Sequence, residues 1–240
     1  MSSPKYLIIG DGRMAKHFSH YLELLNIPFD SWNKKTAPEL LQSRAETATH
    51  ILILISDSQI EPFYQAHLKH LQNKILLHFS GALEIPGLIG IHPLMTFGFD
   101  LYDLPTYKKI HFVTSSDKPI NVLLPGLHNS CHMIAPERKA LYHGLCVFSG
   151  NFTTLLWQET FKEFQKMGLP NSALVPYLEQ IVSNLKAHPE SALTGPLARK
   201  DALTISRHLQ ALQGHAGQKI YSAFVQTYFP EYKGSFYENQ

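Results

Sequence analysis

Cysteine is scarce in this sequence. Cys131 and Cys146 are the only two among 240 residues, and they form no Cys-x-x-Cys pair. A disulfide framework or a thiolate zinc site needs more cysteines at closer spacing, so we expect neither. Free cysteines of this kind are typical of a reducing compartment, and we predict a cytoplasmic protein.

Long apolar runs and an excess of one charge are missing as well. The apolar run from Tyr6 to Ile9 is far too short for a signal-peptide core or a bilayer-spanning helix. Lys and Arg total 21 against 19 Asp and Glu, a formal net charge of +2. This balance gives no electrostatic reason to expect nucleic acid or an anionic membrane as a partner, so we expect a small molecule.

Complete metal-ligand patterns are also lacking. Two His-x-x-His pairs are present, His17/His20 and His67/His70, but neither has a carboxylate or thiolate at metal-site spacing. We interpret these residues as exposed helix histidines and predict no metal site.

The first half of the chain alternates short apolar runs with amphipathic stretches. The runs predict strands over residues 5–9, 29–32, 50–55, 75–79, 88–91 and 109–114, and the first amphipathic stretch predicts a helix over 14–26. Strands this apolar are buried on both faces, and right-handed crossovers join such strands in parallel sheets. The pattern therefore predicts the α/β class, with a Rossmann-like, doubly wound, mainly parallel sheet.

The apolar period becomes helical after Pro136, which suits the first turn of a helix. A long helix is expected as far as about residue 168, followed by helices over 172–187, 200–213 and 218–229. With no low-complexity linker in sight, we predict a dinucleotide-binding domain over 1–134, coupled tightly to an all-helical substrate and dimerisation domain over 135–240. Asn151 lies on a stripe of small residues in the long helix, where burial of its amide would demand hydrogen-bonding partners.

A glycine-rich string follows the first predicted strand and opens the first predicted helix. It reads Gly10-Asp11-Gly12-Arg13-Met14-Ala15. In a dinucleotide fingerprint the first glycine allows a tight turn and the second lets pyrophosphate approach the backbone. A small residue at the third position, here Ala15, allows the helix to pack closely against the strand. We predict that this segment binds a dinucleotide phosphate, against the alternative of a merely structural turn.

The end of the second predicted strand sets the cofactor preference. An NAD site usually carries Asp or Glu there, whereas this chain has Asn33, Lys34 and Lys35. Two lysines without a carboxylate would attract a 2′-phosphate, so NADPH is the expected cofactor. The alternative is a solvated loop whose lysines contact nothing.

Polar residues also follow three other predicted strands, where ligands bind in open α/β sheets. Asp57 is a candidate cofactor residue or a helix cap, and Ser80 and Gly81 are candidate cofactor contacts. His92 is a candidate proton or hydrogen-bond donor to a carbonyl, although a structural histidine is equally compatible with the pattern.

In the helical half, Thr194 to Asp201 predicts a turn that enters a helix. Arg199 is a candidate for binding a substrate carboxylate, with Thr194 and Asp201 beside it. Capping by Thr194 and Asp201, with Arg199 on the surface, is the simpler alternative.

Four segments together resemble a family of Rossmann-like proteins with an uncharacterised all-helical C-terminal domain. They are Gly10 to Ala15, His78 to Leu83, His92 to Phe97 and Leu193 to Asp201. The family is grouped with β-hydroxyacid dehydrogenases, pyrroline carboxylate reductases and ketopantoate reductases, including PanG-type ketopantoate reductases, in the 6-phosphogluconate dehydrogenase C-terminal-like superfamily. The resemblance implies an NADPH-dependent reductase of a small 2-oxo acid, with ketopantoate as first candidate, and a homodimer formed through the helical domain.

We predict catalytic roles for His92 and Arg199 from the residues described above, and the resemblance implies one for Asn151. Two positions depart from its pattern. Relatives carry a catalytic Lys four residues before the Asn, where this chain has Val147, and often carry Gly where this chain has Lys200. An imine reductase and a dinucleotide-binding sensor without turnover are the alternative functions.

Overall fold

A computed structural model describes residues 4–230, which divide into two compact units at residues 157 and 158. The predicted domain junction near residue 134 falls where the helical segment begins, and it stays a prediction. Among the residues described, no helix is long and apolar enough to cross a membrane.

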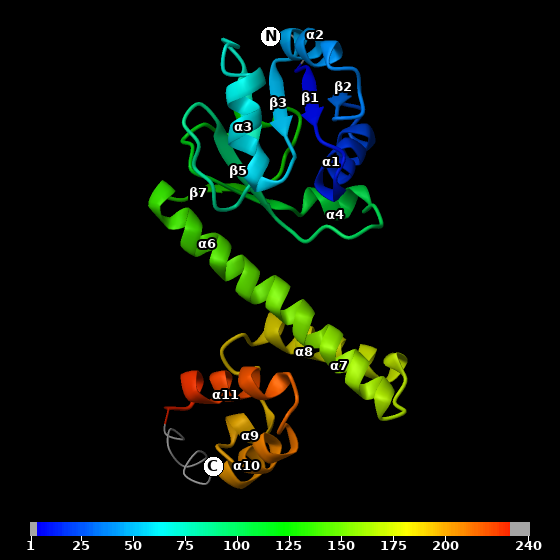
Figure 1. Cartoon of the computed structure of the whole chain (residues 1–240), viewed down its shortest axis with the longest axis vertical. Coiled ribbons are helices and arrows are strands. Elements are labelled where there is room, and N and C mark those ends of the chain that lie inside the picture. Colours follow the sequence, from blue (N-terminus) through cyan, green and yellow to red (C-terminus); the bar gives the residue numbers. More distant parts are fainter. Residues whose placement is uncertain (1–3, 231–240) are drawn as a thin grey trace. The chain divides into compact units, whose positions relative to one another are not determined.

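The first unit is built on a seven-stranded sheet in the order β2-β1-β3-β4-β5-β6-β7 (Figure 1). The strands are β1 (Tyr6–Ile9), β2 (Phe29–Trp32), β3 (His50–Ile53), β4 (Ile75–His78), β5 (Ile89–Leu94), β6 (His111–Thr114) and β7 (Cys131–Met133). Strands β1 to β5 are parallel, and β6 pairs antiparallel with β5. The predicted Rossmann-like, mainly parallel sheet is therefore confirmed, and β7 is a strand that the pattern did not predict.

Helices cover both faces of this sheet. They are α1 (Arg13–Leu24), α2 (Glu39–Thr47), α3 (Asp57–His67), α4 (Leu104–Lys108) and α5 (Ile120–Leu123). Alternate residues of β1 enter two separate cores, Tyr6 and Ile8 on one face and Leu7 and Ile9 on the other. Burial on both faces is the physical reason for the near-continuous apolar strands.

Chain order reverses beside β1, because β2 lies on one side of it and β3 on the other. The crevice outside the carboxyl ends of β1 and β3 is where ligands bind in open α/β sheets.

The long predicted helix is a continuous helical segment with three geometries. A 3₁₀ turn (Pro136–Arg138) leads into α6 (Lys139–Cys146), then a π-helical stretch (Val147–Phe152), then α7 (Thr153–Lys166). Its apolar stripe is exposed, with Leu141, Leu145, Phe148, Phe152 and Leu155 all at least 46% accessible.

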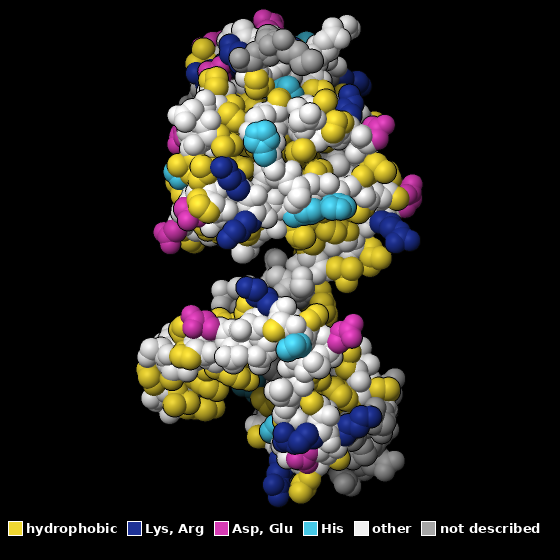
Figure 2. Space-filling view, turned by 180° about the vertical axis from the view of Figure 1, so that it is seen from behind, with side chains coloured by type: hydrophobic (Ala, Val, Ile, Leu, Met, Phe, Trp, Pro, Cys, Tyr) yellow, Lys and Arg dark blue, Asp and Glu magenta, His cyan; other side chains and the backbone are white. Residues whose placement is uncertain are grey.

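The remaining helices are α8 (Asn171–Ala187), α9 (Gly195–Ala198), α10 (Ala202–Ala211) and α11 (Gly217–Tyr228). The helix expected over 200–213 begins later, because Lys200 adopts a left-handed φ of 56° and Asp201 caps α10. On the face drawn in Figure 2, Lys and Arg side chains are scattered among Asp and Glu side chains rather than gathered by sign.

The interpretation of His17 as an exposed helix histidine is wrong. Its side chain is buried, and its Nδ1 lies 2.8 Å from the Tyr107 hydroxyl. Its ring also packs against Phe97 and Tyr102, so this histidine belongs to the core.

Candidate functional site

The glycine-rich turn joins β1 to α1 as the fingerprint requires. Gly10 has φ 130°, and a Cβ there would collide with the carbonyl oxygen of Leu54. Gly12 is the N-cap of α1, and a Cβ there would meet nothing within 4 Å. Ala15 is buried in the core against the sheet, as its predicted packing role requires. The turn therefore leaves open space at the N-terminus of α1, where backbone N–H groups favour an anion.

A cavity of about 1040 Å³ opens over this turn. It is lined by the glycine-rich turn, the ends of β2 and β3, and one side of α3. The lining residues include Gly10, Asp11, Gly12, Arg13, Met14, Trp32, Asn33, Lys34, Ser56, Gln59, Phe63, His67 and Phe97. Of the predicted cofactor residues, the cavity brings together Gly10, Gly12, Arg13, Met14, Asn33 and Lys34.

Lys35 differs from Lys34, because it does not line the cavity. Its backbone N–H donates to Oδ1 of Asn33 at 2.9 Å, so the Asn33 side chain shapes the turn that presents Lys34. Among the aromatic residues of the lining, the ring of Phe63 is paired with those of Trp32 and His67, with centroids 5.8 and 4.8 Å away. The cavity lining thus offers aromatic faces together with the Lys34 ammonium.

A second cluster lies where β4 and β5 face α6. Nδ1 of His92 is 2.8 Å from the Tyr142 hydroxyl, and the His92 and His143 rings lie 5.6 Å apart. Gly81 makes room for these rings, because a Cβ there would lie 2.5 Å from the His143 ring and 3.1 Å from the His92 ring. The predicted residues His92 and Gly81 are therefore neighbours, joined by two α6 residues that were not predicted.

Lys139 also belongs to this cluster. Its side chain is only 3% exposed, and its Nζ donates to the Leu83 carbonyl and pairs with Oε1 of Glu84 at 2.8 Å. His78, at the end of β4, is fully buried, and neither of its ring nitrogens has a hydrogen-bond partner.

The electrostatics of the cluster favour neutral imidazoles. Burial, helped by His143 and Lys139, lowers the pKa of His92 to about 4. Burial and the charge of Lys139 lower the pKa of His78 to about 4. Burial and the neighbouring Cys146 thiol raise the pKa of Tyr142 above its usual range. His92 is therefore uncharged at neutral pH.

Asp57 and Ser80 form a link beside this cluster. The Ser80 hydroxyl donates to Oδ2 of Asp57 at 2.7 Å and accepts from the backbone N–H groups of Ala82 and Leu83. Asp57 stands in the first turn of α3, and its neighbour Ser56 is the N-cap, so Asp57 is not the cap that the sequence suggested. The link fixes the Ser80-Gly81 segment.

Asn151 lies in the π-helical stretch and is exposed, so its amide has no burial cost to offset. In a regular α-helix eight residues would turn it about 80° away from His143, at about 100° per residue. The i to i+5 bonding of a π-helix turns the chain less per residue and reduces this offset. π-Bulges are frequent at functional sites, which makes the position of Asn151 notable.

The predicted substrate residues of the helical region lie around α9 and α10. Asp201 accepts from the backbone N–H and hydroxyl of Thr204, so its side chain caps α10. Thr194 precedes α9 without capping it by its side chain, and Arg199 is exposed. The left-handed φ of Lys200 is a conformation that glycine adopts freely and that other residues adopt rarely.

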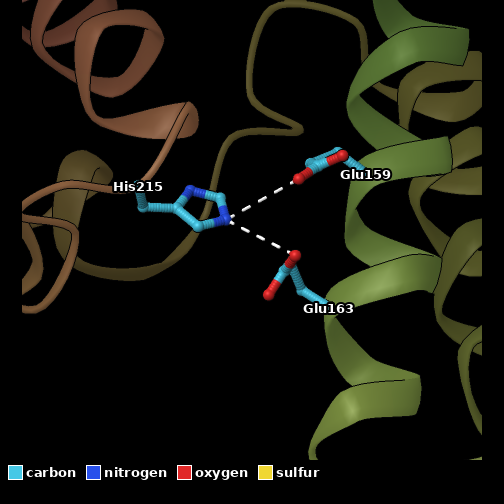
Figure 3. A group of neighbouring side chains, drawn as sticks. All are labelled: Glu159, Glu163 and His215. Atoms are coloured by element: carbon cyan, nitrogen blue, oxygen red, sulfur yellow. Dashed lines mark ion pairs between the residues drawn. The ribbon is translucent and has the colours of Figure 1, made fainter.

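Glu159, Glu163 and His215 form a further group, in which the imidazole faces both carboxylates (Figure 3). Nε2 of His215 is 3.7 Å from each glutamate. Nδ1 of His215 accepts from the Gly217 N–H, so a neutral ring carries its proton on Nε2, the atom that a metal would need. The arrangement therefore suits a neutral imidazole that faces two carboxylates rather than a metal ligand.

The predicted site residues did not include four members of the cluster around His92, namely Lys139, Tyr142, His143 and His78. A signal was available for two of them, because Lys139 and His143 are four residues apart just after Pro136 and so share one helix face. The burial of Lys139 and the isolation of His78 depend on contacts between distant segments, which no local pattern contains.

Comparison with known proteins places the fold among dinucleotide-binding reductases. The profile of a domain of unknown function, DUF2520, matches residues 114–228, slightly less than half of the chain. No curated protein matches by sequence. A Bacteroides fragilis protein assigned as an NADP oxidoreductase is similar in structure, with a TM-score of 0.75 at 20% identity over 94% of this chain and 97% of that one.

Two ligand-bound enzymes have the same fold. Plasmodium falciparum pyrroline carboxylate reductase with NADP bound aligns with a TM-score of 0.60 at 14% identity, covering 97% of this chain and 99% of that one. An imine reductase from Myxococcus stipitatus in complex with NADP⁺ aligns with a TM-score of 0.64 at 14% identity, covering 97% and 95%.

Proposed function

We propose that the protein is an NADPH-dependent reductase of a small carbonyl compound, with ketopantoate, a 2-oxo acid, as the first candidate substrate. The observation that carries the proposal is the cavity over the glycine-rich turn, which is lined by both Gly12, with open space beside it, and Lys34. Structural neighbours that bind NADP or reduce C=N bonds support the same class of chemistry.

The residues present fit the cofactor. The N-terminus of α1 would hold the pyrophosphate, Lys34 would pair with the 2′-phosphate, and Trp32 and Phe63 would contact the adenine. Bound NADPH would supply the hydride. The volume of about 1040 Å³ accommodates a ligand of this size.

His92 serves as an uncharged hydrogen-bond donor rather than as an imidazolium acid. If the Tyr142 hydroxyl donates to Nδ1, the ring carries its proton on Nε2 and can donate it toward a substrate carbonyl. A neutral imidazole whose pKa is held low by its surroundings is a known electrophile in enolisation chemistry. Tyr142 would then fix the tautomer.

The remaining predicted polar residues would contact the substrate. Arg199 would bind the carboxylate through its planar guanidinium, Asn151 would hydrogen-bond the substrate, and Thr194 and Asp201 would shape the turn that carries Arg199. The bulky dimethyl carbon of ketopantoate asks for an apolar surface, which Met95 and Phe97 offer.

Imine reduction is the second candidate, favoured by the two ligand-bound structural neighbours. An iminium cation is stabilised by a nearby anion. Asp57, which accepts a hydrogen bond from Ser80, is the carboxylate that we propose for this role. Reduction of a neutral or anionic carbonyl suits the uncharged His92 better.

We also propose a homodimer through the helical region, because the apolar stripe from Leu141 to Leu155 is exposed in the single chain. Sedimentation at several concentrations tests this.

The decisive experiment measures NADPH oxidation by the purified protein with ketopantoate, pyruvate and a cyclic imine. Ketopantoate should be reduced fastest, and the gene should restore growth of a pantoate-requiring strain. Faster turnover of the imine would favour the second candidate. Tight NADPH binding without turnover of any compound would indicate a dinucleotide-binding sensor.

A further inference from the structure

Lys139 is a buried cation that the proposed reduction does not use. Its ammonium is satisfied by the Leu83 carbonyl at 2.5 Å and by Glu84 at 2.8 Å, and Glu84 also accepts from the Ser115 hydroxyl at 2.6 Å. Removal of an ammonium group from water is costly unless such partners compensate. A lysine that only kept its charge in water would stay on the surface, so the burial of Lys139 needs another explanation.

Two glycines leave space for side chains on the face of α6 that carries Lys139. A Cβ on Gly90 would collide with Nζ of Lys139 and would lie 3.1 Å from the His78 ring. Gly81 receives His143, one helical turn beyond Lys139, in the same manner. The start of α6 thus packs against the end of the sheet, with the Lys139 ammonium over Gly90 and the His143 ring over Gly81.

We propose that Lys139 is a positioning residue of the histidine cluster: its ammonium, which lies over Gly90, holds α6 against the sheet and places a positive charge beside the histidines. The inference rests on the proposed function only for the catalytic meaning of His92. The charge relationship itself belongs to the folded protein without cofactor or substrate.

The charges around the two imidazoles support this assignment. The groups that act on them are Lys139 and His143 from α6, Asp57 from α3, and Glu84 from the loop after β4. The two carboxylates favour protonation of a ring, whereas Lys139 opposes it at both histidines. Because His78 is buried and His92 is half-buried, this repulsion is screened less than it would be in water.

An uncharged His92 matters because its Nδ1 faces a hydroxyl. Only the neutral ring has a free lone pair on Nδ1 to accept from Tyr142, and protonation would reverse the direction of that hydrogen bond. Lys139 would therefore act on the reaction through His92, without contact with substrate.

The test is a ¹H–¹³C NMR titration of histidine-labelled, ligand-free full-length protein, with His78 and His92 assigned by single replacement. Lys139→Met should raise the titration midpoints of His78 and His92 by about one pH unit, since burial remains but the cation is gone. Lys139→Arg keeps the charge and should restore low midpoints. If Lys139→Met does not fold, Lys139→Gln, which keeps a donor for the Leu83 carbonyl, replaces it.

Glu84→Gln is the control of opposite sign. It disturbs the same ion pair but leaves the cation, so neither midpoint should rise. If Lys139 only held α6 in place through its ion pair with Glu84, Lys139→Met and Glu84→Gln should loosen the site alike. Unchanged midpoints in a folded Lys139→Met or Lys139→Gln protein, or equal rises in the Glu84→Gln protein, would overturn the inference. Absence of reductase activity would overturn the proposed function without affecting this result.

Discussion

The hydroxyl of Tyr142, on α6, lies 2.8 Å from Nδ1 of His92, on β5. These residues are 50 positions apart in sequence, and their contact joins the helix that follows the sheet to the carboxyl end of a central strand. The hydrogen bond orients the one histidine of the cluster for which we propose a direct role with substrate.

Tyr142→Phe should therefore lower kcat by about 10- to 100-fold while KM changes little, because the His92 tautomer is no longer fixed. Stability should fall by about 1 kcal/mol from the lost hydrogen bond. Tyr21→Phe is a matched control, since the Tyr21 hydroxyl donates to Asn129 at 2.7 Å in the core. An equal loss of kcat in both variants would show that Tyr142 acts only through stability.

The two glycines of the turn should respond differently to the same replacement. Gly10→Ala should destabilise the fold by more than 1 kcal/mol, because φ 130° is unfavourable for alanine and its methyl group would collide with Leu54. Gly12→Ala should leave urea unfolding nearly unchanged, since its Cβ meets no protein atom. Fluorescence titration should nevertheless detect weaker NADPH binding by Gly12→Ala, because the methyl group occupies the space for pyrophosphate. Normal NADPH affinity in that variant would argue against phosphate binding at the turn.

The adjacent lysines provide a test of cofactor preference with an internal control. Lys34 lines the cavity and Lys35 does not, so Lys34→Ala should weaken NADPH binding by about 1 to 3 kcal/mol and leave NADH binding almost unchanged. Lys35→Ala should have a clearly smaller effect. Equal affinities of the unmodified protein for NADPH and NADH would contradict the role of both lysines.

The sequence predicts the sheet and the phosphate turn because their signals are local. The apolar strands and the string from Gly10 to Ala15 act through backbone geometry that neighbouring residues determine. The boundaries of the helical half were less predictable: the start of α10 depends on the left-handed φ of Lys200, and the π-helical stretch around Asn151 leaves no periodic mark.

The histidine cluster could not be predicted, because it depends on tertiary contacts. From the sequence alone Lys139 is an ordinary helix lysine, because its neighbours Gly90, on β5, and Glu84, in the loop after β4, are distant from it along the chain. The same limit explains the error at His17, whose burial results from Tyr107 and Gly98, far along the chain.

The buried histidines should make stability depend on pH. Burial lowers the folded-state pKa of His78 and His92 from 6.5 to about 4, so the unfolded chain binds more protons between these values. Stability should therefore rise with pH in this window, by up to about 1.4 kcal/mol per pH unit for each group. Urea unfolding at several pH values measures the slope. His78→Leu should make it shallower, whereas His70→Leu, at an exposed position, should not. A free energy of unfolding that does not change between pH 4.5 and 6.5 would contradict the conclusion that His78 and His92 are uncharged in the folded protein.

Arg199 and Arg207 test the carboxylate site, because both are exposed arginines, one just before α10 and one within it, and only Arg199 lies in the Thr194 to Asp201 turn. Arg199→Ala should raise KM for a 2-oxo acid by about 10- to 100-fold, the effect of losing a charge-assisted pair of hydrogen bonds. The methyl ester of the same acid carries no negative charge, so its kcat/KM should change far less. NADPH affinity should stay unchanged, because a residue that positions substrate does not bind the nucleotide. Arg207→Ala should leave the kinetics of acid and ester unaltered. If Arg199→Ala behaves like Arg207→Ala, or if acid and ester lose activity equally, the carboxylate is bound elsewhere and Arg199 belongs to the surface.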